Sequence, residues 1–330
     1  MSQTKVRINK FDNMKGLAIF LIVIWHLEIL RVIPPLGYKI IYIFSLPVFF
    51  FVAGYFSKTS PDQLMKSVKR LLIPYIIFCA ITRVVQYAVT GDPYFDIMFI
   101  RPSFALWFLI SLFMMKLFLP VFDRMKHPIL ISLIIALFFG FYVIKPNLLG
   151  LARTFGYMPV FLFGFYYKDI SQMVTDSYPR LVELYNRYYI ILFIVLLAGM
   201  LFVLSNITVN FQFRAAYQGF FVFGMIKRLF LIFCYMAGPV MLMKVMTNRE
   251  CFLTKWGRNS MAIYLLHCYF RITLEGVIPN VFEHHLRTYC ICITLLIFAV
   301  TIILSRDVVT KYLNKFTDGV YDLIFKKIPL

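Results

Sequence analysis

The feature that most constrains the fold of this chain is a series of about ten long apolar stretches joined by short polar segments. Each stretch has roughly 16 to 22 residues, close to what an α-helix needs to cross the hydrocarbon core of a bilayer. Lipid offers the backbone no hydrogen-bond partners, so such stretches are stable only as helices. The expected spans cover residues 15–33, 39–57, 71–90, 104–122, 129–145, 153–168, 188–205, 226–246, 259–278 and 288–305.

Composition supports the same conclusion. Of the 330 residues, 61% are hydrophobic and only 15% are charged, which leaves too little polar side chain to cover a soluble domain of this size. The connecting segments are too short to fold alone. We therefore expect an all-α polytopic membrane protein, a bundle of about ten transmembrane helices that forms a single membrane-embedded domain over residues 1–330.

The net charge of +19 suggests nucleic acid at first sight, but its distribution favours a membrane. With the N-terminus inside, most Lys and Arg residues fall in segments on one side of the bilayer, as is typical of cytoplasmic loops beside anionic lipid. We expect a cell (plasma or inner) membrane protein with both termini cytoplasmic, in contact with lipid and not with nucleic acid. The six cysteines are scattered without a CxxC pair, and no metal-binding motif is present, so no metal is expected.

The first span carries a histidine inside its apolar run. On an α-helix, Lys15 lies about 20° and Asp12 about 40° around the axis from His26, and Lys15 is about 16 Å below it. An ionisable group at mid-bilayer is a candidate functional residue, because lipid cannot solvate it. The alternative is a neutral histidine that is hydrogen-bonded to a neighbouring helix. Glu28 lies about 200° away from His26, and we expect it to pair with an arginine of another helix.

A basic cluster follows the second span. Lys66, Lys69 and Arg70 stand at positions i, i+3 and i+4, so they share one helix face where the third span enters the membrane. Such a face suits the phosphates of an anionic cofactor. The alternative is ordinary anchoring by cytoplasmic positive charge.

The segment GRNSMAIYLLHCYF opens the ninth span. Ser260, Tyr264 and His267 lie along one stripe of the helix, and Asn259 or Ser260 is the expected N-cap. The serine and the histidine are two turns apart, too far for a nucleophile to bond its base, so a serine hydrolase is excluded. Tyr264 and His267 fit the wall of a channel.

Several arginines lie toward the predicted outer face. Arg83 stands within the third span and, with Gln86, is expected to face an aqueous cavity, because a lipid-facing arginine costs about 2.5–3.5 kcal/mol. Arg101 and Trp107 open the fourth span and Arg153 opens the sixth. These two arginines suit either a site or lipid head groups.

The outer loop after the seventh span alternates apolar and polar residues from Ile207 to Arg214. A period of two predicts extended chain. The loop either covers a cavity or lies on the bilayer, and the second interpretation is slightly favoured.

Six motifs, taken together, resemble the integral-membrane acyltransferase family three, in particular its fucose O-acetylase-like branch. They are FDNMKG with His26 eleven residues after Lys15, PVFFFVAGYFSK, KSVKRLLIPY, LWFLISLF, ARTFGYMPVFLFGF and GRNSMAIYLLH, and they span residues 7 to 270. The family usually has an arginine ten residues before the histidine. Lys15 keeps that charge but lacks the planar fork of a guanidinium.

The resemblance implies an O-acetyltransferase that moves an acetyl group from cytoplasmic acetyl-CoA to a hydroxyl of a cell-surface or lipid-linked glycan. It makes His26 the general base, in direct transfer or, less favoured, through an acyl-His26 intermediate, and Asp12 the group that orders Lys15 or the helix start. Alternatives are a transporter or exporter of a glycan or anionic solute, and the same fold with succinyl-CoA. The donor would be held by Lys15, Lys66, Lys69 and Arg70, and the acceptor by Arg83, Trp107, Arg153, Tyr264 and His267.

Overall fold

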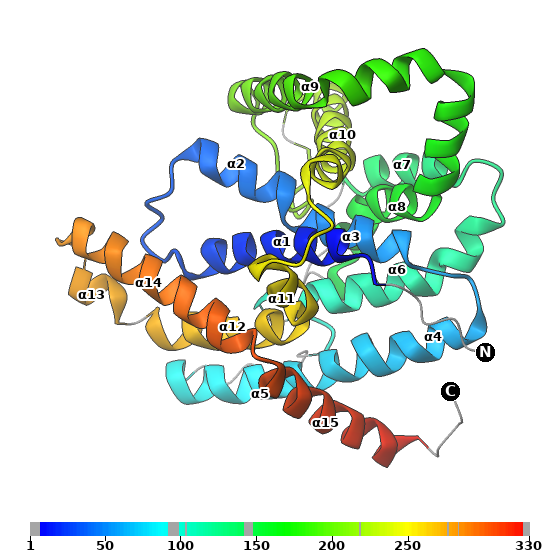
Figure 1. Ribbon diagram of the computed structural model, residues 1–330. Coiled ribbons are helices and arrows are strands. Elements are labelled where there is room, and N and C mark those ends of the chain that lie inside the picture. The colour runs from blue at the N-terminus through cyan, green and yellow to red at the C-terminus, as the bar shows by residue number, and fades with distance from the viewer. Residues whose placement is uncertain are drawn as a thin grey trace. The chain divides into compact units, whose positions relative to one another are not determined.

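A computed structural model describes residues 7–91, 99–102, 104–141, 148–217, 219–275, 277–282 and 284–325. The described residues form helices and no strand. They divide into two compact units, the first built from Met1–Phe49 and Gly238–Lys311 and the second from Phe50–Ala237 and Tyr312–Leu330. Helices α3, α10 and α15 continue from one unit into the other, and Figure 1 labels the elements along the chain. The all-α architecture expected from the apolar stretches is confirmed.

The first unit is organised around α1. Helices α11 and α12 pack against α1, and α14 lies beside both α1 and α12. The unit comprises α1 (Asn9–Leu27), α2 (Pro35–Phe44), the start of α3 (Leu46–Tyr55), the end of α10 (Phe221–Val245), α11 (Phe252–Arg258), α12 (Ser260–Leu274), α13 (Ile278–Phe282), α14 (Leu286–Leu304) and the start of α15 (Asp307–Ile324).

Two glycines bring α1 and α11 into backbone contact. A Cβ atom on Gly16 would collide with the carbonyl oxygen of Leu253, and one on Gly257 would collide with the carbonyl oxygen of Asp12. Between these glycines, the buried Asn13 accepts a hydrogen bond from the Thr254 hydroxyl at 2.5 Å. Small residues permit this close approach of membrane helices. The FDNMKG and GRNS motifs therefore meet in space and fix the start of α1.

Helix α1 ends at Leu27, six residues before the expected boundary. The Glu28 carboxylate accepts hydrogen bonds from the backbone N–H of Ile33 at 2.9 Å and from the Tyr38 hydroxyl at 2.6 Å. The hydroxyl oxygen of Tyr289 accepts the N–H groups of Ile29 and Leu30 at 2.9 and 3.2 Å. These bonds satisfy a non-helical backbone after His26. The expectation that Glu28 pairs with an arginine is wrong, because a tyrosine and a backbone amide occupy its oxygens.

The second unit is organised around α6 and α8. Gly54 of α3 and Gly164 of α8 pack against the backbone carbonyls of Phe161 and Phe51, respectively. The unit comprises the end of α3, α4 (Pro61–Ser67), the π-helix η1 (Val68–Leu72), α5 (Ile73–Thr90), η2 (Phe104–Leu106), α6 (Trp107–Asp123), α7 (Pro128–Phe138), η3 (Leu148–Gly150), α8 (Leu151–Ser177), α9 (Pro179–Asn206), the start of α10 and the end of α15.

Seven helical segments among the described residues are long and apolar enough to cross a membrane: Pro35–Tyr55, Asp62–Val89, Phe104–Asp123, Leu148–Ser177, Pro179–Asn206, Phe221–Val245 and Leu286–Leu304. The other three expected spans fall on α1, α7 and α12, and part of the span at 129–145 lies outside the described residues. The total of about ten spans stays a prediction, as does the single domain over 1–330.

Candidate active site

His26 stands near the C-terminal end of α1, beside a second histidine on α12. The ring centroids of His26 and His267 are 5.1 Å apart. His267 is fully buried, and its Nδ1 lies 2.9 Å from the carbonyl oxygen of Ile263. A carbonyl oxygen can only accept a hydrogen bond, so Nδ1 of His267 carries a proton. In the neutral His267 ring this leaves the lone pair on Nε2. The contact between His26 and His267 brings together two imidazoles from distant parts of the sequence.

Arg271 joins the two helices at this histidine pair. Its Nη1 donates a hydrogen bond to the carbonyl oxygen of His26 at 3.0 Å, and its Nη2 contacts Glu275 at 2.9 Å. The carbonyl is near the end of α1, where backbone acceptors lack partners within the helix. Arg271 is not among the site residues predicted from the sequence. The sequence feature that could have indicated Arg271 is a cation one helical turn after His267 within an apolar run.

Tyr264 belongs to the same group, since its ring centroid lies 6.2 Å from that of His267. The structure therefore brings three of the predicted site residues together, namely His26, Tyr264 and His267.

Asn259 is the N-cap of α12, but its side chain makes no capping bond and instead donates to the Ser305 carbonyl and to Asp307, both at 2.8 Å.

Asp12 and Lys15 form a separate cluster at the start of α1. The buried Asp12 carboxylate lies 2.5 Å from Arg7 Nε and 2.9 Å from Lys15 Nζ, with Arg258 Nε at 3.9 Å. Burial raises the pKa of Asp12, but the hydrogen bond from Arg7 and the charge of Lys15 outweigh it, so the pKa lies below its ordinary value. Asp12 is about 21 Å of helix rise from His26 and so does not orient that imidazole. It holds Lys15 and Arg7 at the helix start.

The predicted phosphate cluster lies in the second unit, with Lys66 at the end of α4 and Lys69 and Arg70 on the π-turn η1. Lys69 Nζ is 3.5 Å from Asp318 and 4.0 Å from Asp322, and it sits 5.0 Å from the Tyr321 ring centroid. Arg70 is 3.8 Å from Asp318. Lys66 is exposed. Single π-turns within helices often mark functional sites. The acidic partners come from α15, almost 250 residues away, and no local pattern in the sequence predicts them.

Trp107 and Arg153 meet in the second unit. The Arg153 guanidinium lies 4.3 Å from the Trp107 ring centroid, in the range of a cation–π contact. Both side chains are buried. A hydrogen bond of 2.8 Å between the Thr154 and Ser111 hydroxyls ties α8 to α6 beside them. Arg153 thus packs against an aromatic ring within the protein and does not extend to lipid head groups.

Arg83 contacts its expected neighbour. Its Nη1 lies 3.5 Å from Gln86 Oε1 on the same helix, α5. Neither residue lines the cavity described next. That Arg83 faces water stays a prediction.

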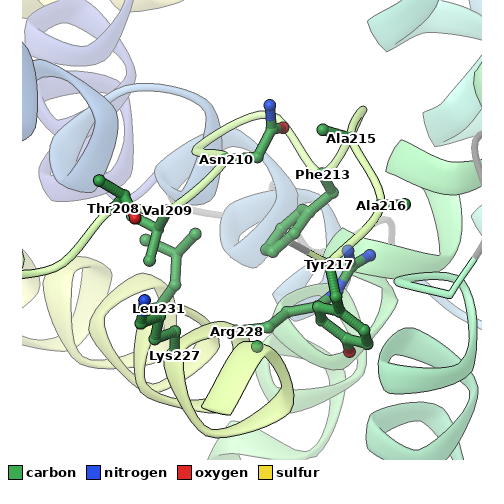
Figure 2. A pocket seen from close by; sticks show the side chains of 11 residues that line it. Thr208, Val209, Asn210, Phe213, Ala215, Ala216, Tyr217, Lys227, Arg228 and Leu231 are labelled. Carbon is green, nitrogen blue, oxygen red and sulfur yellow. The ribbon is translucent and has the colours of Figure 1, made fainter. Parts of the chain in front are cut away.

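The loop after α9 covers a cavity of about 160 Å³ (Figure 2). Phe213 is 1% exposed, and its ring packs where a Cβ atom on Gly156 would stand. The hydroxyls of Tyr157 and Tyr235 both donate to the carbonyl oxygen of Phe211, at 3.0 and 2.7 Å. The structure therefore supports the alternative that the loop covers a cavity, and its position relative to the bilayer stays a prediction. A backbone turn at Phe213, with φ at +54°, directs its ring inward and interrupts the extended alternation.

Helices of membrane-crossing length and apolar composition define a polytopic membrane protein, and His267, Arg153 and Arg228 are buried within it. A family profile described as an acyltransferase domain matches residues 8–306. The chain belongs to acyltransferase family 3, and it is a membrane acyltransferase. Neither the comparison with curated proteins nor that with solved structures gives a match.

Proposed function

We propose that this protein transfers an acetyl group from cytoplasmic acetyl-CoA to a hydroxyl of a cell-surface or lipid-linked glycan, with His26 as the general base. The observation that carries the proposal is the His26–His267 pair, set within a chain of an acyltransferase family. Two imidazoles in contact inside an apolar helix bundle have no need to be there for packing alone, because apolar side chains fill such positions at lower cost.

The reaction needs one proton acceptor. As the glycan hydroxyl oxygen attacks the thioester carbonyl carbon, Nε2 or Nδ1 of His26 takes the hydroxyl proton. The new C–O bond forms, the C–S bond breaks, and the CoA sulfur leaves as a thiolate that recovers the proton. A neutral imidazole has one ring nitrogen with a free lone pair, and that nitrogen can accept the proton. Direct transfer requires no second nucleophile.

His267 and Arg271 support this base in the proposal. The bond from His267 Nδ1 to the Ile263 carbonyl fixes the orientation of the second ring, against which His26 packs. The bond from Arg271 to the His26 carbonyl fixes the end of α1. Together they hold the His26 ring in a defined position, which is what a general base requires. Tyr264 and His267 would form the wall beside the reacting groups.

Donor binding is assigned to the basic residues Lys15, Lys66, Lys69 and Arg70. Acetyl-CoA carries several negative charges at its nucleotide end, and guanidinium or ammonium groups bind phosphates through charge-assisted hydrogen bonds. Asp318 and Asp322 already neutralise part of the charge of Lys69 and Arg70. A donor phosphate would compete with these carboxylates, so the proposal includes their displacement.

Acceptor binding is assigned to Arg83, Trp107 and Arg153. Stacking of a guanidinium on an indole holds both groups flat, and arginine and tryptophan are side chains that can contact hydroxyl or acidic groups of a sugar. We place the protein in the plasma or inner membrane, with both termini in the cytoplasm, on the charge distribution of its segments.

The experiment is CoA release from acetyl-CoA by the purified full-length protein in detergent or nanodiscs, with membrane glycan extract as acceptor. We expect release by the wild type and at least a 100-fold loss in His26→Ala and His26→Gln, since a general base contributes about 10²–10⁴-fold. His127→Ala is the matched control, because His127 is exposed at the start of α7. Equal release by wild type and His26→Gln would refute the role of His26.

The same assay separates the remaining alternatives. Succinyl-CoA in place of acetyl-CoA, with mass spectrometry of the glycan, identifies the acyl group that is transferred. Movement of a glycan across vesicles without acetyl-CoA would support a transporter, but membership of an acyltransferase family argues against it.

A further inference from the structure

Two aromatic side chains, Phe213 and Tyr217, line the cavity beneath the loop after α9. The Tyr217 hydroxyl donates to the Leu137 carbonyl at 2.7 Å, and the Tyr217 N–H donates to the Gly140 carbonyl at 2.7 Å. On its other side Tyr217 packs against Gly224 of α10, where a Cβ atom would collide with its ring. Phe213 fills the second side of the cavity. The side chains that line the cavity are thus held in place by tight packing. Its volume is several times what one water molecule needs.

An arginine is buried in this cavity with two donors free. Arg228 is 6% exposed, and its guanidinium lies 4.6 Å from the Phe213 ring centroid and 6.0 Å from that of Tyr217 (Figure 2). Its Nε and Nη2 atoms are buried and find no hydrogen-bond partner among the described residues. These two N–H groups form one edge of the guanidinium, and this edge has the spacing that binds two oxygens of a carboxylate or phosphate.

The charge of the cavity has one sign. Lys227 and Arg228 are its cations, and the described residues that line it include no carboxylate. Asn210 adds a side-chain amide, whose oxygen already accepts the backbone N–H of Arg214 at 2.7 Å. A buried guanidinium with an open edge beside a second cation is complementary to an anion.

A row of contacting aromatic rings links the cavity to the predicted acceptor residues. Phe213 contacts Tyr157 at 4.9 Å between centroids, and Tyr157 contacts Trp107 at 6.0 Å. Arg153 lies on Trp107. This row of three rings has an arginine at each end, and all of these residues belong to the second unit.

We propose that the Arg228 cavity binds the negatively charged group, a carboxylate or a phosphate, of an acidic saccharide, so that the acceptor of this acyltransferase is anionic. That the bound saccharide is the acyl acceptor rests on the proposed function. The anion binding itself does not depend on catalysis. Arg228 would hold two oxygens of the group on its open edge, and Lys227 would add charge at the mouth of the cavity.

The test is ligand-induced thermal stabilisation of the purified full-length protein. The probes are glucuronate, inorganic phosphate and, as a neutral match, glucose. A ligand that binds the folded state raises the unfolding temperature in proportion to ln(1 + [L]/Kd). We expect glucuronate or phosphate to stabilise the wild type and glucose to leave it unchanged. Arg228→Gln should weaken anion binding at least tenfold, and Arg228→Lys, which keeps the charge but loses the two-donor edge, at least threefold.

The control variant is Arg214→Gln, because Arg214 is an exposed cation on the same loop. It should change anion affinity less than twofold. Stronger binding of glucuronate than of phosphate assigns the ligand to an acidic sugar, and the reverse assigns it to a phosphate-linked saccharide. Equal stabilisation of wild type and Arg228→Gln, or none of the wild type by either anion, overturns the proposal. Because CoA release is not measured here, the result is independent of whether acetyl-CoA is the donor.

Discussion

Gly16→Ala should destabilise the protein, because α1 and α11 touch through their backbones at this position. The new Cβ atom would collide with the carbonyl oxygen of Leu253, which cannot rotate away as a side chain would. Forcing extra volume into a packed contact costs about 1–3 kcal/mol. Alanine recovers up to about 1 kcal/mol of helix propensity. With that gain subtracted, we expect the free energy of unfolding to fall by up to about 2 kcal/mol, which lowers the unfolding temperature by up to roughly 8 °C.

The assay is thermal unfolding of the purified variants in one detergent, followed by circular dichroism. Gly199→Ala is the control, because a Cβ atom on Gly199 of α9 meets nothing within 4 Å. At Gly199 only the difference in helix propensity between glycine and alanine acts. The free energy of unfolding of Gly199→Ala should therefore equal that of the wild type or exceed it by up to about 1 kcal/mol. If Gly16→Ala unfolds at or above the temperature of Gly199→Ala, the backbone contact between α1 and α11 is refuted.

Three further predictions concern charged groups. Asp12→Asn should lower the free energy of unfolding by about 1–2 kcal/mol at pH 7. Because the folded-state pKa of Asp12 is lowered, ionised Asp12 stabilises the protein above its ordinary pKa of 3.8, and this stabilisation is lost as the pH falls through the lower folded value. The measurement is the unfolding temperature of wild type and Asp12→Asn from pH 7 to pH 3. A difference between the two proteins that stays constant over this range would contradict the prediction. Asp318→Asn should lower the KM for acetyl-CoA two- to fivefold, since it frees Lys69 and Arg70, and Lys69→Gln should raise it; an unchanged KM in both would separate this cluster from donor binding. Arg271→Gln should lower kcat at least tenfold with little change in KM, and Arg271→Lys should restore part of it, because the residue positions His26 through its carbonyl; a change in KM alone would contradict a positioning role.

The helices were predictable where the chain is apolar over a bilayer's thickness. Segments such as Phe104–Asp123 and Leu286–Leu304 agree with the expected spans to within a few residues, because hydropathy and length alone decide them. The end of α1 was not predictable. It depends on Glu28 bonding Tyr38 and on Tyr289 receiving two backbone amides, and the second of these contacts crosses some 260 residues of sequence.

The candidate site shows the same division between local and distant contacts. The ion pair of Asp12 with Lys15 follows from helical spacing. The contact of His26 with His267 does not, since no sequence pattern says which two helices meet. The inward packing of the outer loop was not predictable, because its alternation is interrupted by a turn at Phe213 that depends on packing against Gly156.

The most direct test of the central claim is an electron cryo-microscopy structure of the protein with a non-hydrolysable acetyl-CoA analogue. The account predicts that the analogue's acyl carbonyl lies beside the His26 ring, with room for a hydroxyl within about 3 Å of an imidazole nitrogen. An analogue bound with its acyl group away from His26, or a His26 ring that faces lipid, would contradict it.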